Sequence, residues 1–277
     1  MFKKIGLAIA FSPSGINLLK QAAKMQLMFN AELYLIHVGK KESSDEEAIE
    51  NMLIEAKVDR NNCSVIWKKG DPAKSIIKTC QELDLNLLIM GALEKEPALK
   101  YYIGSVARKI MRQVPCSLLI LKAPVKDVKT YKIIGVQIDY SSLSEKSVRY
   151  SYELAVKENT EKLILIREFK VPGLTITVYD SGSIKETQET RNKWIDEESL
   201  KMEMFVNELN LTGIPIEKIC LYGKAGWEST AYLKSIEADL FVLPAPKRKL
   251  EMFDRIFQHD LEYVIEDLPC DLLIIKN

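Results

Sequence analysis

The segment VPCSLLILK at residues 114–122 returns as LPCDLLIIK at residues 268–276, an offset of 154 residues. Each copy places a proline and a cysteine before a run of leucine and isoleucine, as expected for a strand that is buried on both faces. The beginning of the chain recurs as well, because KKIGLAIA at residues 3–10 aligns with KIIGVQID at residues 132–139. The sequence therefore contains two related halves.

The distance between two landmarks inside each half is also conserved. Gly70 begins a stretch whose strand closes at Gly91, and Gly223 begins one whose strand closes at Pro244, so both spans are 21 residues. We predict two tandem domains, residues 1–125 and residues 126–277. A chain of 277 residues has enough length to bury two separate cores.

Short apolar runs alternate with amphipathic segments in the first half. The predicted strands are 5–11, 32–38, 63–68, 87–90 and 117–122, and the predicted helices are 16–29, 44–57, 71–83 and 104–112. This alternation predicts an α/β fold with a parallel sheet covered by helices on both faces. Ligands of such sheets lie beyond the carboxyl ends of the strands, which places Ala10, Val38 and Met90 around one crevice.

The stretch that follows the strand at residues 87–90 has the features of a phosphate-binding loop. Gly91 lets the backbone approach a phosphate closely, and Gly104-Ser105 opens a helix whose free N–H groups favour an anion. Glu94 puts a negative charge into the same loop. A carboxylate about 4 Å from a phosphate oxygen would cost roughly 4 kcal/mol at an effective dielectric near 20. Helix capping alone is the alternative interpretation of Gly104-Ser105.

The pattern resembles the universal stress protein family, and the resemblance covers nearly the whole chain twice. The residues that carry it are His37-Val38, Gly70-Asp71-Pro72-Ala73, Leu88-Ile89-Met90-Gly91, Gly104-Ser105 and Pro115-Cys116. The resemblance implies two tandem universal-stress-protein-like domains, each a five-stranded parallel sheet of the Rossmann-like, adenine nucleotide alpha hydrolase-like type. ATP-binding members of the family carry Gly-x2-Gly-x9-Gly-Ser/Thr and an aspartate at the end of the first strand.

The resemblance implies a single nucleotide site, for ATP with magnesium, in the N-terminal domain. Its residues would be Ala10, Val38, Met90, Gly91, Gly104, Ser105 and Val106. Two positions depart from the family pattern, because Glu94 replaces the second glycine and Ala10 replaces the aspartate.

The second domain departs further, and we expect no nucleotide in it. Opposite Gly91, Gly104 and Ser105 it has Pro244, Gln258 and His259. It keeps Asp139 opposite Ala10, which we interpret as a turn residue ahead of Ser141-Ser142. The basic run at residues 247–249 is interpreted as a solvated loop. An insertion at about residues 169–204 contains Trp194 and a helix longer than its counterpart, and it would cover the crevice, bind a partner or form a plain surface excursion.

Composition excludes several classes of function. Thirty-nine basic and 39 acidic residues cancel, so we expect no nucleic-acid partner. No apolar run reaches the roughly 20 residues of a membrane span, so we expect no membrane insertion and a cytoplasmic location. Five widely spaced cysteines with no CxxC, and two histidines, predict reduced, buried thiols and no metal site.

The last strand of each half is apolar on both faces, so pairing these strands with each other would cover two open sheet edges. The resemblance then implies an intramolecular pseudo-dimer that could dimerise again. For function, our leading hypothesis is a non-catalytic stress-response sensor or scaffold with the one N-terminal nucleotide site. The alternatives are an interaction module that binds no nucleotide and, with the least support, a weak ATP hydrolase. We find no GxSxG, HExxH or Walker A lysine, and we predict no catalytic residue.

Overall fold

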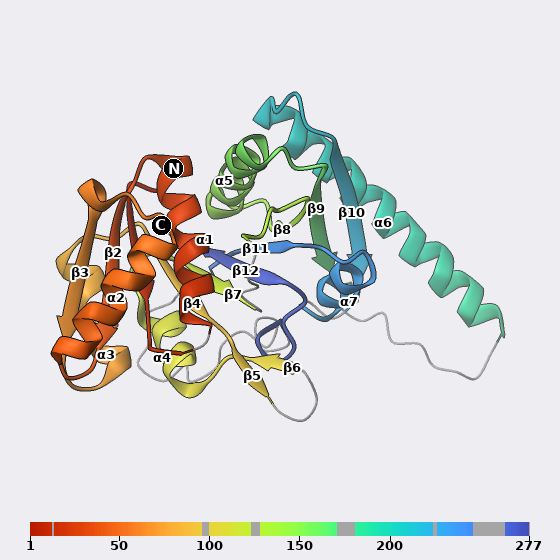
Figure 1. Cartoon of the computed structure of the whole chain (residues 1–277). Coiled ribbons are helices and arrows are strands. Elements are labelled where there is room, and N and C mark those ends of the chain that lie inside the picture. Colours follow the sequence, from red (N-terminus) through yellow and green to blue (C-terminus); the bar gives the residue numbers. More distant parts are fainter. Residues whose placement is uncertain are drawn as a thin grey trace. The chain divides into compact units, whose positions relative to one another are not determined.

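The computed structural model describes residues 1–12, 14–95, 100–122, 128–170, 181–223, 226–245 and 264–276. The chain divides into two compact units, which are described separately below. The first comprises Met1–Tyr131 together with Glu266–Asn277, and the second comprises Lys132–Ile265. Figure 1 labels most of the helices and strands of both units.

The first unit alternates parallel strands with helices, as the sequence predicts. Its strands are β1 (Lys4–Ala8), β2 (Glu32–Val38), β3 (Cys63–Lys68), β4 (Leu87–Gly91) and β7 (Ser117–Leu121), and its helices are α1 (Gly15–Phe29), α2 (Ser43–Glu55), α3 (Pro72–Glu82) and α4 (Ser105–Gln113). A short 3₁₀ helix spans Arg60–Asn62. The predicted end of β1 is three residues too late, because the chain turns at Ala10, whose carbonyl accepts the Ser12 N–H at 2.8 Å.

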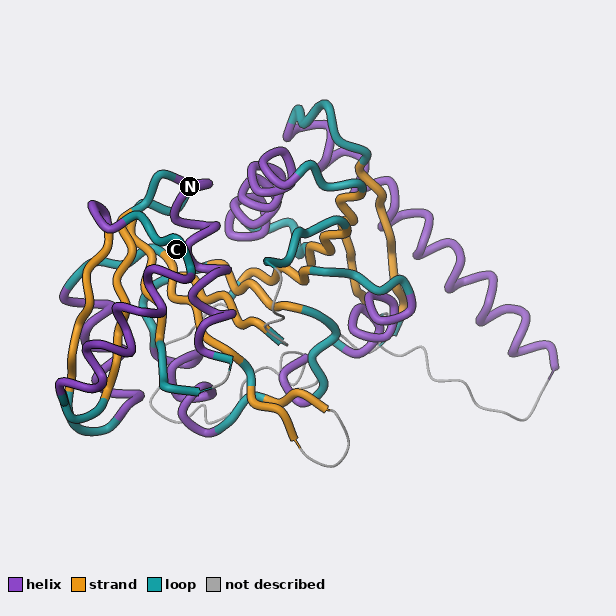
Figure 2. The backbone as a smooth tube through the Cα atoms, in the orientation of Figure 1, coloured by secondary structure: helices purple, strands orange, loops and turns teal. Residues whose placement is uncertain are grey.

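The strands of this unit follow the order β12-β7-β4-β1-β2-β3. The chain runs from β1 to one side through β2 and β3, and then returns to the other side of β1 with β4 and β7. The order therefore switches between β1 and β4, where open α/β sheets bind ligands. Helices α1 and α2 pack together, as do α3 and α4, and the alternation of helices and strands can be followed in Figure 2.

Strand β12 (Asp271–Ile275) comes from the end of the second repeat but lies in the first unit. It pairs antiparallel with β7, with Leu273 opposite Leu119. This confirms the prediction that the last strands of the two halves pair with each other. The strand is buried at all five positions, so it closes the edge that β7 would otherwise leave open.

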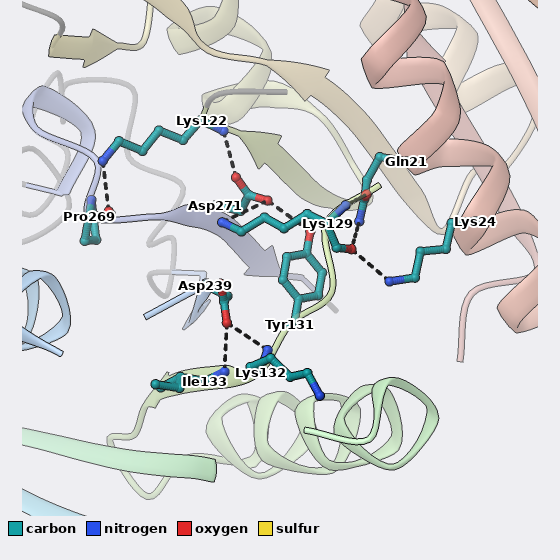
Figure 3. Close-up of polar contacts among 10 residues, drawn as sticks. All are labelled: Gln21, Lys24, Lys122, Lys129, Tyr131, Lys132, Ile133, Asp239, Pro269 and Asp271. Carbon is teal, nitrogen blue, oxygen red and sulfur yellow. Dashed lines mark hydrogen bonds and ion pairs between the residues drawn. The ribbon is translucent and has the colours of Figure 1, made fainter. Parts of the chain in front are cut away.

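The first residue of β12 fixes this pairing with a buried carboxylate (Figure 3). Asp271 is 3% exposed, and its Oδ1 accepts the backbone N–H of Lys122 at 2.9 Å. Its Oδ2 accepts the hydroxyl of the fully buried Tyr131 at 3.2 Å and lies 4.0 Å from Lys129 Nζ. Lys129 is anchored in turn, because its carbonyl accepts a hydrogen bond from Lys24 Nζ at 2.8 Å.

The second unit repeats the alternation of parallel strands and helices, with strand order β10-β9-β8-β11. Its elements are β8 (Ile133–Gln137), α5 (Ser142–Glu158), β9 (Lys162–Phe169), α6 (Ser181–Leu209), β10 (Ile216–Tyr222), α7 (Trp227–Ser235) and β11 (Leu240–Pro244). The predicted longer helix is confirmed, because α6 has 29 residues where α2 has 13. The part of the insertion at residues 171–180 lies outside the described residues.

One polar contact recurs in both units and supports the internal repeat. Asp239 accepts the backbone N–H groups of Lys132 and Ile133 at 2.8 and 2.9 Å, as Figure 3 shows. In the first unit, Asn86 accepts those of Lys3 and Lys4, both at 3.0 Å. In each unit a side chain just before one central strand thus holds the start of the other, which fixes the register at the switch point.

Candidate functional site

The predicted site residues gather at the carboxyl edge of the first sheet. Ala10 is exposed just beyond β1, and Val38 is the half-buried last residue of β2. Met90 is buried near the end of β4, which closes with Gly91. Because these strands are parallel, their last residues share one edge, and β1 and β4 are neighbours at the switch point.

A two-stranded antiparallel ribbon, which the sequence analysis missed, connects β4 to α4. It consists of β5 (Leu93–Lys95) and β6 (Lys100–Tyr102), with Leu93 opposite Tyr102. Directly opposed residues of such a pair lie about 4.5 to 5.5 Å apart between Cα atoms. The ribbon therefore returns the chain to its starting point and places the beginning of α4 beside the end of β4.

The start of α4 has the properties of an anion-binding helix terminus. Gly104 is the buried N-cap, and Ser105 and Val106 are the exposed first residues of the helix. A glycine cap has no side chain to bond the first N–H groups, and the first turn contains no acidic residue. The prediction that a helix opens at Gly104-Ser105 is thus confirmed, with glycine rather than serine as the cap.

A positive charge lies at the same helix end. Arg108 folds back so that its Nε donates a hydrogen bond to the carbonyl of Ile103 at 2.9 Å, one residue before the cap. A cation at a helix N-terminus opposes the helix dipole, which there carries roughly +0.5 elementary charge. An anion at this position would be attracted by the dipole and by the guanidinium together.

Glu94, the acidic residue of the predicted loop, lies inside β5 opposite Tyr101. The backbone at this position is an extended strand rather than a glycine turn, which accounts for the loss of the motif's second glycine. The side chain of Glu94 lies outside the described part of the structure. The roles of Ala10, Val38, Met90, Gly91, Gly104, Ser105 and Val106 in binding a nucleotide therefore stay predictions.

The corresponding edge of the second unit is occupied by a side chain of the protein itself. Glu168, near the end of β9, is 5% exposed and accepts the backbone N–H groups of Gly226 and Ser229, both at 2.7 Å. These groups belong to the start of α7, so a carboxylate sits where an anion would bind. Gln137 donates a further hydrogen bond to the same carboxylate at 2.9 Å.

A second buried acidic side chain, that of Glu198 on α6, contacts Arg167, the residue of β9 that precedes Glu168. Glu198 on α6 is 7% exposed and pairs with Arg167 at 3.1 Å and with Lys201 at 2.7 Å. These cations, through hydrogen bonds and charge, outweigh the effect of burial and hold the pKa of Glu198 below its usual value. Burial of Tyr140 raises the pKa of its phenol above the ordinary value, and the nearby Glu198 charge acts in the same direction.

Asp139 acts locally, as predicted. Its Oδ1 accepts both the backbone N–H of Ser141, at 3.0 Å, and the hydroxyl of that residue. Ser141 in turn caps α5 by accepting the N–H of Ser144. Asp139 is therefore confirmed as a turn residue. The predicted residues Gln258 and His259, and the basic run at residues 247–249, lie outside the described residues.

The five cysteines form no disulfide, and three of them, Cys80, Cys116 and Cys270, are buried. Cys63 and Cys220 are half-buried, so the prediction of buried thiols is wrong for these two. Cys63 lies on β3, at the open edge of the first sheet. Burial raises the pKa of its thiol to about 11.

We predict that Cys63 reacts slowly with iodoacetamide at neutral pH. With a pKa near 11 in place of 9.0, its thiolate fraction at pH 8 falls about 100-fold, while the higher basicity regains about tenfold in nucleophilicity. Alkylation of Cys63 in the folded protein should thus be about tenfold slower than in urea, as peptide mass mapping would show. The rate should rise about tenfold per pH unit up to about pH 11, and a plateau near pH 9 would contradict the raised pKa.

In the described part of the chain, no three or more His, Cys, Asp or Glu side chains are grouped so as to hold a metal ion. None of the described helices combines the length and the apolar content that crossing a bilayer requires.

Comparison with known proteins identifies relatives of this architecture. Residues 1–122 match the model of the universal stress protein family. A universal stress protein of Methanothermobacter thermautotrophicus is 32% identical over 57 residues, which are 21% of this chain and 38% of that protein. Universal stress protein MJ0531 of Methanocaldococcus jannaschii is 24% identical over 146 residues, which are 46% of this chain and 86% of that protein.

Two solved structures share the fold over the full length of the chain. A Pseudomonas aeruginosa protein superposes with a TM-score of 0.74 at 18% identity, covering 99% of this chain and 93% of its own. A universal stress protein of Archaeoglobus fulgidus superposes with a TM-score of 0.65 at 17% identity, covering 99% of this chain and 98% of its own. The fold of both repeats is therefore shared with these proteins.

Proposed function

Because the chain belongs to the universal stress protein family, we propose that its first repeat binds one adenine nucleotide and that the protein acts as a non-catalytic stress-response sensor or scaffold. The nucleotide, ATP with magnesium, would lie beyond the carboxyl ends of β1 and β4. Ala10, Val38 and Met90 would line the base and sugar end. Gly91, Gly104, Ser105 and Val106 would face the phosphates.

One observation carries this proposal: the start of α4 combines a glycine cap with the guanidinium of Arg108. The exposed backbone of Ser105 and Val106 offers N–H groups, and the neighbouring charge favours a polyanion. In the second repeat the carboxylate of Glu168 already bonds the start of α7. Helix α7 is the counterpart of α3, whose start is likewise capped by a carboxylate of the chain, that of Asp71. The start of α4 has no side-chain cap and no acidic residue in its first turn, so the nucleotide is proposed there.

We predict that Ser105→Asp weakens ATP binding by about tenfold or more. The new carboxylate would stand at the first turn of α4, and two charges about 8 Å apart at an effective dielectric near 20 repel by about 2 kcal/mol. Isothermal titration calorimetry with ATP, with and without magnesium, would measure the change. Arg108→Gln should weaken binding in the same direction, and Glu94→Gly, which restores the motif's second glycine, should tighten it.

Ser142→Asp is the matched control. Ser142 is the exposed first residue of α5 in the second unit, so the substitution is the same at an equivalent helix position. It should leave ATP affinity unchanged. Wild-type protein that shows no heat with ATP, together with binding by Glu94→Gly, would favour an interaction module that takes no nucleotide. Steady phosphate release well above background would indicate a hydrolase.

A further inference from the structure

Three aromatic rings stand in a row at the carboxyl ends of β1, β2 and β3. The ring centroids of Phe11 and His37 are 4.7 Å apart, and those of His37 and Trp67 are 5.0 Å apart. His37 and Trp67 are register partners on neighbouring strands, so the sheet itself holds them side by side. Phe11 is the outer ring and is 44% exposed, so part of its surface is accessible beside the candidate ligand site.

The middle ring is fixed in place. His37 is 8% exposed, and its Nδ1 lies 3.1 Å from the carbonyl oxygen of Ile9. A carbonyl oxygen only accepts, so Nδ1 carries a proton and donates it. Gly39 leaves room for the ring, because a Cβ at that position would lie 2.6 Å from Nε2. Phe11 therefore packs against the His37 ring, whose orientation is fixed by burial and by its hydrogen bond to Ile9.

The second repeat fills the same place with its own side chains. Tyr140 aligns with Phe11, and the guanidinium of Arg167 lies 5.1 Å from the centre of its ring. The ring of Phe205, on α6, contacts Tyr140 edge-on at 5.6 Å between centroids. The hydroxyl of Tyr140 bonds Glu198 at 3.3 Å. Where the second repeat packs both a cation and another ring against Tyr140, Phe11 packs on His37 and is 44% exposed.

We propose that the exposed ring of Phe11 is the stacking surface for the base of the nucleotide, with His37 and Trp67 as positioning residues behind it. This inference rests on the proposed nucleotide site. Ala10, just beyond β1, offers only a methyl group, so the adjacent ring of Phe11 supplies the area that a planar base can cover. Every base has a π-face, so stacking tolerates base identity, and guanine nucleotides should bind by the same contact.

The test uses the full chain with Trp194→Phe and Trp227→Phe, which leaves Trp67 as the one tryptophan of the three. Magnesium ATP and sodium tripolyphosphate are titrated separately, by Trp67 fluorescence and by calorimetry. Phe11→Ala should weaken ATP binding by about 5- to 150-fold, the range expected for loss of one base–aromatic contact, and should leave tripolyphosphate affinity within about twofold. Phe11→Trp should retain ATP binding. Tyr140→Ala, the same truncation in the second repeat, should leave ATP affinity unchanged.

The outcomes separate the two proposals. ATP binding that is equally tight in wild type and Phe11→Ala overturns the stacking role and leaves the phosphate site standing. An equal loss of ATP and tripolyphosphate affinity in Phe11→Ala also overturns it, because the ring would then act on the phosphate end or on folding. If neither probe binds the wild-type chain, the proposed nucleotide site fails and the stacking role fails with it.

Discussion

Asp271→Ala is expected to lower the free energy of unfolding of the first unit by about 3 kcal/mol, because it removes a buried carboxylate from three partners. The backbone N–H of Lys122 would lose its acceptor, and the hydroxyl of Tyr131, which is fully buried, would lose a charged partner. Lys129 would lose an ion pair whose loss costs less, because its side chain is 31% exposed. Urea denaturation followed by circular dichroism would measure the change.

Two further variants serve as comparisons. One removes only the charge of Asp271, and the other removes the side-chain acceptor at the aligned position of the first repeat. Asp271→Asn keeps one carbonyl oxygen for the Lys122 N–H and should cost about half as much as the alanine variant. Ser117→Ala probes the position that aligns with Asp271 in the first repeat, where the hydroxyl accepts one N–H, from Lys276, at 3.1 Å. It should cost only about 1 kcal/mol. A free energy of unfolding of Asp271→Ala within about 0.5 kcal/mol of wild type would show that the carboxylate does not hold β12.

Much of the fold is predictable because short stretches of the sequence are enough to indicate the individual strands and helices. The ranges predicted for β2 and β3 coincide with those observed, since each strand is an apolar run between turn residues. The pairing of β7 with β12 follows from two runs that are apolar on both faces and need a partner. The ribbon of β5 and β6 was missed because its strands have three residues each, too few to show a period.

The arrangement of side chains at the two carboxyl edges was not predictable from the sequence. Glu168 lies 58 residues before Gly226, and nothing near either residue indicates that they meet. Phe11 follows β1, Trp67 lies on β3, and the rings of both contact His37 on β2. Contacts of this kind depend on strand order, which spacing along one chain does not encode. Gly91 and Gly104 were found because each stands at a local boundary that the sequence shows, the end of an apolar run and the start of an amphipathic helix.

The described helix starts differ in whether the chain itself supplies a carboxylate to them. In the first repeat, α4 begins with a glycine cap and the guanidinium of Arg108. In the second, α7, the counterpart of α3, follows the cap residue Gly226 and has the carboxylate of Glu168 at its start, as the start of α3 has that of Asp71. A helix start that carries its own carboxylate needs no external anion to satisfy its N–H groups. Removing the carboxylate of Glu168 should therefore destabilise the second unit and create an anion site at the start of α7.

Glu168→Ala is therefore expected to lower the free energy of unfolding of the second unit by about 3 kcal/mol or more, since it leaves the N–H groups of Gly226 and Ser229 buried without their acceptors. The hydroxyl of Ser229 is itself buried without a hydrogen-bond partner among the described residues. The variant would therefore leave a further unsatisfied polar group beside the two N–H groups that lose their acceptor. Glu168→Gln should also be costly, because one of the two N–H groups would then face an amide N–H₂ instead of an oxygen. Urea denaturation would measure both variants.

Acetate should partly rescue Glu168→Ala, because a small carboxylate can enter the space that the side chain leaves and accept the same N–H groups. Stabilisation by a ligand that binds only the folded state grows as RT ln(1 + [L]/Kd), about 1.4 kcal/mol when acetate reaches roughly ten times its Kd. Wild type and Glu168→Gln, which keep the space filled, are the matched controls and should respond to acetate only as to added salt. Equal acetate stabilisation of all three proteins, or an alanine variant as stable as wild type, would show that the start of α7 does not depend on a built-in anion. The contrast between the starts of α4 and α7, which supports placing the nucleotide at α4, would then be lost.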